Sequence, residues 1–236
     1  MSHFHLVVSS KSWFMWKEVK NMNSNEIIQA IVDSGVLAVI RANSVDDAVK
    51  MATYAAKGGI KGLEITFTVP DADKVIETLV KNGVDAVVGA GTVLNAETAK
   101  LAYSKGAKFI VSPCFDDGVN DFCKEVDIPY FAGCFTPTEI YNAMKKGVKV
   151  VKVFPGSVCK PSYFKDVHGP FPYAKLLPSG GVSLENINDW IKNGAVAVSA
   201  GSSLTAPAKT GDFEKIVDNA REFVEEVKKA RAQYCK

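Results

Sequence analysis

The chain has 236 residues, long enough for one large α/β domain or two small ones. Its composition, 47% hydrophobic and 23% charged, is ordinary for a globular protein. A formal net charge of +2 gives no reason to expect nucleic acid or an anionic membrane as a partner. Only three histidines are present, so a His-based metal site or a Ser/His/Asp triad is hard to assemble, and no metal is expected.

The cysteines and the first residues bear on location. Five cysteines, an odd number without a CxxC pair, suit reduced thiols in a cytoplasm better than a disulfide framework. Residues 1–21 are apolar but interrupted by polar residues, and no apolar stretch in them has signal-peptide length. We interpret them as an N-terminal extension of unknown role. No run in the chain reaches transmembrane length, so we expect a cytoplasmic protein.

From residue 22 onward, apolar runs alternate with amphipathic stretches up to the C-terminus. The predicted helices cover 26–34, 45–57, 72–81, 96–105, 118–125, 137–146, 162–167, 184–192 and 213–232. The predicted strands cover 36–40, 62–67, 86–88, 109–111, 130–134, 148–155, 174–177 and 195–200. Strands that are apolar on both faces indicate a parallel sheet. Eight strands, each followed by a helix, predict a single-domain (β/α)8 TIM barrel over 22–236. An open doubly wound sheet would want a GxGxxG turn after its first strand, where RANS stands instead.

The densest apolar run, at 148–155, contains a lysine. Strand alternation places Val150, Lys152 and Phe154 on one face. Because an unpaired ammonium is costly to bury, the alternative is an edge strand with Lys152 in solvent. Most of the other strands are equally apolar, however, and the barrel that they predict has no edge.

A glutamate has the matching position in the strand at 62–67. Leu63, Ile65 and Phe67 take the helix-facing side, which turns Glu64 and Thr66 into the barrel. An inward lysine and an inward glutamate form either a structural salt bridge or a catalytic pair. A buried pair often fails to offset its desolvation cost, which favours chemistry.

These two residue types suit covalent catalysis. Burial disfavours the ammonium form of a lysine, and the neutral amine can attack a ketone to form a Schiff base. Such a site also needs one group that moves protons on and off the neighbouring carbon and the carbinolamine oxygen, and Glu64 fits that need.

Further candidate residues follow other strands, because active sites of such barrels lie at the C-terminal strand ends. Arg41, Thr92 and Pro113 stand there. The loops after strands seven and eight contain glycines, which let backbone N–H groups approach an anion. A phosphate is expected at the residues of these two loops, which are Ser179, Gly180, Gly181, Gly201 and Ser202.

Five motifs together resemble the family of 2-keto-3-deoxy-6-phosphogluconate (KDPG) aldolase and 4-hydroxy-2-oxoglutarate (KHG) aldolase. The motifs are GLEITFTVP at 62–70, GAGTVLN at 89–95, FIVSP at 109–113, VKVFPG at 151–156 and PSGGV at 178–182. The resemblance covers about residues 25–232. It implies a cofactor-free class I aldolase that cleaves KDPG to pyruvate and glyceraldehyde 3-phosphate, a role in the Entner–Doudoroff pathway, and a homotrimer.

The resemblance also assigns roles. It makes Lys152 the Schiff-base lysine and Glu64 the proton shuttle. Thr92 and its neighbours, including Thr66, hold the pyruvyl carboxylate, while Pro113 and Phe154 wall the pocket. The phosphate is assigned to the glycine-containing loops after strands seven and eight.

The chain departs from the family pattern at one position. Some members carry an arginine four residues after the catalytic glutamate, where this chain has Thr68. Arg41, in the sequence VIRANS, is the expected substitute for binding the carboxylate. Three alternatives stay open at this stage. They are the same chemistry on KHG or the phosphogalactonate epimer, a barrel that binds a phosphorylated metabolite without cleaving it, and a metal-dependent aldolase.

Overall fold

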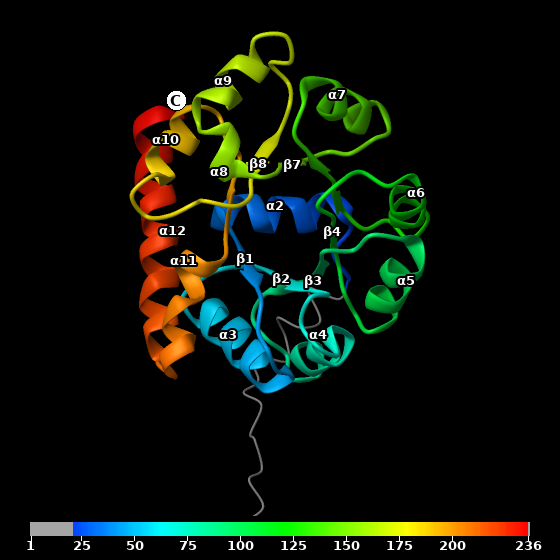
Figure 1. The fold of residues 1–236 in the computed structure, drawn as a ribbon, viewed down its shortest axis with the longest axis vertical. Coiled ribbons are helices and arrows are strands. Elements are labelled where there is room, and N and C mark those ends of the chain that lie inside the picture. The colour runs from blue at the N-terminus through cyan, green and yellow to red at the C-terminus, as the bar shows by residue number, and fades with distance from the viewer. Residues whose placement is uncertain (1–20, 236) are drawn as a thin grey trace, which may run out of the picture.

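The computed structural model describes residues 21–235, so the predicted extension at 1–21 lies almost wholly outside the described residues. Helices form a ring around parallel strands, with one helix lying across the middle (Figure 1). The strands are β1 (Val36–Ile40), β2 (Gly62–Thr66), β3 (Val87–Gly91), β4 (Ile110–Val111), β5 (Tyr130–Phe131), β6 (Gly133–Cys134), β7 (Val151–Val153), β8 (Leu176–Pro178) and β9 (Val198–Ala200).

The helices agree with the predicted pattern at most positions. They are α2 (Ser24–Ser34), α3 (Val45–Lys57), α4 (Ala72–Lys81), α5 (Ala96–Ser104), α6 (Asp117–Glu125), α7 (Pro137–Lys145), α8 (Gly156–Cys159), α9 (Ser162–His168), α10 (Ile187–Lys192), α11 (Ser202–Thr205) and α12 (Glu214–Tyr234), with a 3-10 helix η1 (Ala206–Thr210). The sequence did not predict α8, α11 or η1, because so short a segment shows no helical period. No helix in residues 21–235 combines the length and apolarity needed to cross a membrane.

The parallel sheet confirms the predicted barrel in part. Six strands pair in the order β5-β4-β3-β2-β1-β9, a half-barrel, and three more in the order β6-β7-β8. The predicted continuous sheet of eight strands is therefore not observed. The strand predicted at 130–134 divides at Ala132, because its first half pairs with β4 and its second half with β7. Isolated parallel bridges join Leu176 to Ala195 and Ser179 to Ser199.

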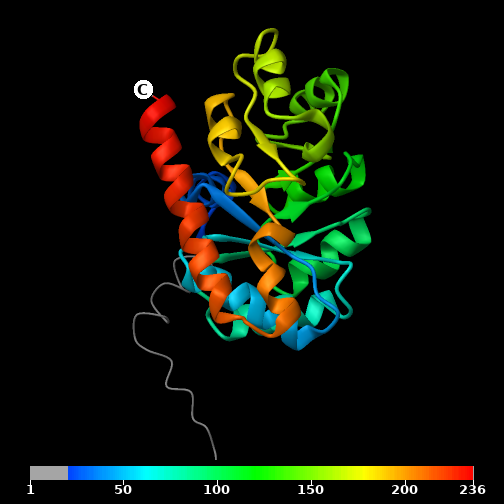
Figure 2. The same ribbon diagram turned by 60° about the vertical axis from the view of Figure 1, so that its left-hand side comes forward.

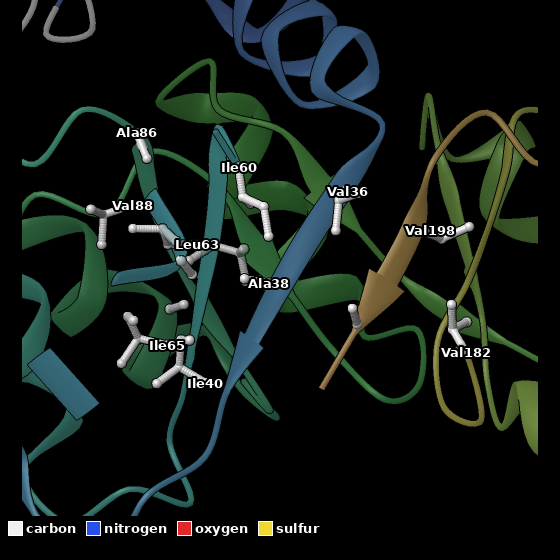
Figure 3. Packing of buried hydrophobic residues seen from close by; sticks show 14 of the residues in the cluster. Val36, Ala38, Ile40, Ile60, Leu63, Ile65, Ala86, Val88, Val182 and Val198 are labelled. Carbon is white, nitrogen blue, oxygen red and sulfur yellow. The ribbon is translucent and has the colours of Figure 1, made fainter. Parts of the chain in front are cut away.

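The outward-facing side chains of the strands pack under the helices. This outer cluster includes Leu63 and Ile65 of β2 and Val151 and Val153 of β7, all buried. Figure 3 shows Leu63 and Ile65 among the strand residues of this cluster. The predicted parity of β2 and β7 is thereby confirmed, since Glu64 and Lys152 alternate with these residues.

The inner faces of the strands are covered at their N-terminal ends by α2. Three isoleucines of this helix, Ile27, Ile28 and Ile31, are buried in an inner cluster with strand residues. The strand members of the inner cluster are Leu37, Val87, Phe109, Val111, Phe131, Val150, Leu177 and Ala197. The start of α2 is fixed by Asn23, whose side chain accepts from the Asn25 and Glu26 amides in a capping box. The inner faces of the strands are thus closed by apolar packing at their N-terminal ends.

The C-terminal helix α12 holds α2 in place. It runs along one side of the molecule, against α3 and α10 (Figure 2). The Arg231 guanidinium of α12 donates hydrogen bonds to the carbonyl oxygens of Val32 and Asp33 in α2, and to that of Val196 before β9. At the end of α2, these bonds give the Asp33 carbonyl oxygen a donor and the Val32 carbonyl oxygen a second donor besides the Gly35 amide.

Candidate active site

Lys152 and Glu64 lie together inside the sheet. Lys152 is 4% exposed and Glu64 is fully buried, and the lysine Nζ is 3.5 Å from the Glu64 Oε1 atom. The alternative of an edge strand with Lys152 in solvent is therefore excluded, and the predicted inward Lys152 is observed. Within residues 21–235, neither carboxylate oxygen of Glu64 accepts a hydrogen bond. The desolvation cost of this buried carboxylate is therefore poorly compensated by the protein, as expected for a group whose hydrogen-bond partner belongs to a ligand.

The neighbouring strand leaves room for the Glu64 carboxylate only because residue 91 is glycine. A Cβ atom on Gly91 would lie 2.2 Å from the Glu64 Oε1 atom and 2.7 Å from its Cδ atom. Thr92 follows directly and has a left-handed backbone, with φ of 57°. Such a conformation is unfavourable for a threonine and is often found at functional sites. The motif that contains both residues thus shapes the wall beside Glu64.

A chain of hydroxyl groups connects β2 to the end of β1. The Thr66 hydroxyl donates to the Ile40 carbonyl oxygen at 2.9 Å and lies 2.8 Å from the Thr68 hydroxyl oxygen. The Arg41 guanidinium donates to the Thr68 hydroxyl at 3.2 Å. Arg41, the arginine expected to bind the carboxylate, therefore lies beside Thr68, the position at which the resemblance expects an arginine.

The apolar wall predicted at Phe154 and Pro113 is split. The Lys152 Nζ atom lies 5.5 Å from the centroid of the Phe154 ring, within the range of a cation–π contact. Pro113 lies instead against β6, since a Cβ atom on Gly133 of that strand would meet the Pro113 carbonyl oxygen at 2.1 Å. Glycine at residue 133 lets these two segments approach each other.

The loop after β8 has a backbone that only glycine adopts easily. Gly180 and Gly181 have φ of 90° and 73°, in the left-handed region. The loop packs against the start of α8, because a Cβ atom on Gly156 would lie 2.6 Å from the Gly180 carbonyl oxygen. The Gly180 amide faces the Ser199 carbonyl oxygen in the bridge between Ser179 and Ser199, whereas the amide N–H group of Gly181 donates no hydrogen bond within the described chain. The Gly181 donor is available to a ligand.

One cleft brings most of the predicted residues together. It contains Arg41, Phe154 and the glycine-containing loops after β8 and β9. The other predicted residues are not part of its lining, namely Lys152, Glu64, Thr66, Thr92 and Pro113. Its lining also includes polar residues that the sequence did not single out, namely Asn43, Asp47, Ser183, Ser199, Ser203 and Lys209. No sequence signal marked them, because serine, asparagine and lysine after a strand are common in any loop.

Cysteines do not compete with Lys152 as nucleophiles. Burial raises the pKa of Cys123 to about 12, and burial with nearby acidic groups raises that of Cys134 in β6 to about 12. Both side chains are therefore neutral thiols at physiological pH, and a thiol is a poor nucleophile.

Comparison with known proteins points to one family. A family model described as KDPG and KHG aldolase matches residues 27–219. A 2-dehydro-3-deoxy-phosphogluconate aldolase from Treponema pallidum (strain Nichols) is 32% identical over 194 residues, which cover 80% of this chain and 92% of the relative. A KHG/KDPG aldolase from Escherichia coli (strain K12) is 33% identical over 208 residues, which cover 85% of this chain and 96% of the relative.

A solved structure agrees with this result. It is the KDPG aldolase from Legionella pneumophila, in which pyruvate was captured at low pH as a covalent carbinolamine intermediate. Its TM-score to this chain is 0.76 at 26% sequence identity, with 82% of this chain and 96% of that chain covered.

Proposed function

This chain belongs to the KDPG and KHG aldolase family, and from that membership we propose that it is a class I aldolase, a carbon–carbon lyase that acts through a Schiff base. The observation that carries the proposal is the buried Lys152 held 3.5 Å from Glu64. The substrate we assign is KDPG, which is cleaved to pyruvate and glyceraldehyde 3-phosphate. The names of the relatives support this substrate class.

In the proposed reaction, the Lys152 ammonium passes a proton to the Glu64 carboxylate, and the neutral amine that results attacks the C2 keto carbon of the substrate. The carbinolamine formed loses its oxygen as water after Glu64 supplies a proton, which gives a protonated imine. Glu64 then takes the proton of the C4 hydroxyl, the C3–C4 bond breaks, and its electron pair moves into the imine. The aldehyde leaves, Glu64 returns the proton to C3 of the enamine, and water releases pyruvate. These proton transfers need a carboxyl group that is not held by fixed hydrogen bonds, and the Glu64 side chain accepts none within the described chain.

The remaining site residues orient the substrate in this proposal. Arg41 binds the carboxylate in place of the missing arginine, because its guanidinium already lies 3.2 Å from the Thr68 hydroxyl. Thr92 and Thr66 contribute polar groups at the pyruvyl end, and the Phe154 ring provides an apolar wall beside Lys152. Pro113 does not line the cleft, and only the resemblance supports its place in the wall. Thr66 acts only as an acceptor or a positioning residue here, since its hydroxyl proton is donated to the Ile40 carbonyl oxygen.

The phosphate binds in this proposal between the loops after β8 and β9. The amides of Gly180 and Gly181 are the main donors, with Ser179, Gly201 and Ser202 next to them. Lys209 lines the same cleft and adds positive charge. A dianionic ligand group fits this arrangement better than a neutral one.

The test is borohydride reduction with pyruvate, followed by intact mass and peptide mapping. We expect a reduced pyruvyl adduct on Lys152, and none in Lys152→Ala. Lys149→Ala is the matched control, because Lys149 is an exposed lysine whose amine contacts the Asn25 side chain. Glu64→Gln should still form the imine but slow hydrogen exchange at pyruvate C3 by about 100-fold or more. An adduct on another lysine would refute the assignment.

Two alternatives keep specific support. KHG is the runner-up substrate, because the E. coli relative is named for both substrates. The phosphogalactonate epimer differs in a single stereocentre and is named in a second E. coli relative. Cleavage rates on the three compounds decide among them.

A barrel that only binds a phosphorylated metabolite would bind phosphate without forming a pyruvyl adduct. A metal-dependent aldolase would lose activity in EDTA.

The finer architecture and assembly are also part of this proposal. We infer that the two sheets close into one eight-unit barrel, supported by the bridges between Leu176 and Ala195 and between Ser179 and Ser199. We infer a homotrimer, which agrees with the exposure of Leu94 at 56% and Tyr141 at 42%. Light scattering would measure the oligomer. A cytoplasmic location and a role in the Entner–Doudoroff pathway follow from the proposed substrate.

A further inference from the structure

Ser199 of β9 is buried but has no hydrogen-bond partner. It is 2% exposed, and its hydroxyl oxygen makes no hydrogen bond to any described residue. Side-chain atoms with this property occur in only three residues of the chain between 21 and 235, and the others are Glu64 and Trp190. Trp190 packs edge-on against Phe164 in the outer cluster, outside the cleft. Ser199 is buried and unpartnered like Glu64, and it also lines the cleft.

An unpartnered hydroxyl has a cost that alanine would avoid at this position. Burying a hydroxyl without a hydrogen bond is unfavourable, and Ala197 and Ala200 show that small apolar residues fit into this strand. Ser203 of the same cleft is satisfied, because its hydroxyl donates to the Val182 carbonyl oxygen at 2.7 Å. The free hydroxyl of Ser199 therefore points to a partner supplied by a ligand.

The position of Ser199 indicates which part of the ligand it meets. Ser199 pairs with Ser179 across β8 and β9, and Gly201 lies two residues further along the same inward face. Ser199 is thus roughly 7 Å deeper than the loop of Gly201, at about 3.3 Å per residue. On the other side, Lys152 is in register with Leu177, two residues before Ser179. Ser199 lies between the proposed phosphate site and the Schiff-base lysine.

We propose that Ser199 hydrogen-bonds the hydroxyl on the substrate carbon next to the phosphate-bearing carbon, C5 in KDPG, and that it selects for this hydroxyl. This inference rests on the proposed aldolase function. The carbon chain of a phosphorylated keto acid runs from the imine carbon to the phosphate, and C5 is the position nearest to the phosphate end that still bears a hydroxyl. A site built to bind a hydroxyl discriminates against an analogue that lacks it, because its own polar group is then left unpaired.

The test uses the reverse, condensing reaction of the full chain with pyruvate. Two acceptor aldehydes are compared, D-glyceraldehyde 3-phosphate and 3-oxopropyl phosphate, which lacks the hydroxyl that becomes the C5 hydroxyl. We expect the parent enzyme to prefer the hydroxylated acceptor in kcat/KM, and Ser199→Ala to lose about tenfold of this preference, the worth of one hydrogen bond. Ser203→Ala, which removes an already satisfied hydroxyl in the same cleft, should keep the parent preference.

Two further measurements separate this role from a structural one. Borohydride trapping with pyruvate alone should be unchanged in Ser199→Ala, because pyruvate lacks the C5 hydroxyl. The melting temperature of Ser199→Ala should stay equal or rise, since the variant removes an unsatisfied buried group. A parent-like acceptor preference in Ser199→Ala, or an equal loss on both acceptors, would overturn the role of Ser199. Absence of a pyruvyl adduct in the parent itself would overturn the aldolase function first.

Discussion

The inner faces of the strands form two layers of opposite character. The inner cluster, at the N-terminal ends, is apolar and is covered by α2. Two residues further along the same strands, Val150 is followed by Lys152, Leu177 by Ser179 and Ala197 by Ser199. We call Glu64, Gly91, Lys152, Ser179 and Ser199 the polar layer. Both layers are almost fully buried. Of the two, only the polar layer contains buried side-chain oxygen atoms without a hydrogen-bond partner, those of Glu64 and Ser199.

This difference separates stability from function. The inner cluster gains free energy from apolar burial, with every side chain in contact with others of its kind. The polar layer buries a lysine, a carboxylate and a hydroxyl at a cost that the protein alone does not offset. A region that is worse for folding than its apolar neighbour is expected where a substrate completes the contacts. Substitutions in the two layers should therefore affect different measurements.

The largest effect is expected from converting the polar layer into an apolar one. Lys152→Met should lower aldol cleavage by more than about 1,000-fold, because the amine forms the covalent intermediate. It should also destabilise the fold by about 3–5 kcal/mol, since Glu64 keeps a buried charge without its cation. The double variant Lys152→Met/Glu64→Leu should stay inactive but recover parental stability or exceed it. Urea unfolding measures this, and a double variant less stable than Lys152→Met would disprove the view that the pair costs stability.

The inner cluster should show the opposite behaviour. Ile31→Ala removes a fully buried side chain of α2 and should lower the free energy of unfolding by about 2–5 kcal/mol. The kcat value at a temperature where the variant is folded should change by less than about threefold, because no catalytic group touches α2. A large fall in kcat with parental stability would show that the two layers are not separate.

Gly91→Ala tests how closely the polar layer is fitted. The new Cβ atom would stand 2.2 Å from the Glu64 Oε1 atom, so the carboxylate must move. A shift of about 1 Å in a catalytic group can reduce the rate by about 100-fold, and the fall should be in kcat rather than in KM. Gly118→Ala in α6 is the control, since its Cβ atom would meet nothing closer than 3.3 Å. Equal kcat values for the two variants would remove Gly91 from this role.

The smallest effect is expected from a carboxylate outside both layers. Hydrogen bonds from the backbone amides of Thr136 and Phe135 hold the pKa of Glu139 below its usual value. Because the folded pKa is depressed, its stabilisation is present above the unfolded pKa and is lost as the pH falls through the folded pKa. Glu139→Gln should cost about 0.5–1 kcal/mol at pH 7. The difference from the parent should vanish in acid, and a difference that persists there would contradict this account.

Local signals in the sequence were enough for most of the fold. The bounds of α3 and α4 agree with the prediction to the residue, because capping residues and closing glycines mark both helices. The inward positions of Glu64 and Lys152 followed from strand alternation alone. The strand at 130–134 was predicted as one and is divided, because its pairing partners change at Ala132, which no local pattern records.

The sequence by itself thus determined the repeating βα order, the faces of the strands and the two residues of the buried pair. These follow from side-chain period and backbone chemistry within one element. Only the tertiary structure decided that Arg41 lies against Thr68, that Gly91 makes room for Glu64, and that the Ser199 hydroxyl has no partner. Each of these is a relation between strands 20 or more residues apart, fixed by the register of the sheet. A serine in a strand looks the same in sequence whether its hydroxyl is satisfied or waits for a ligand.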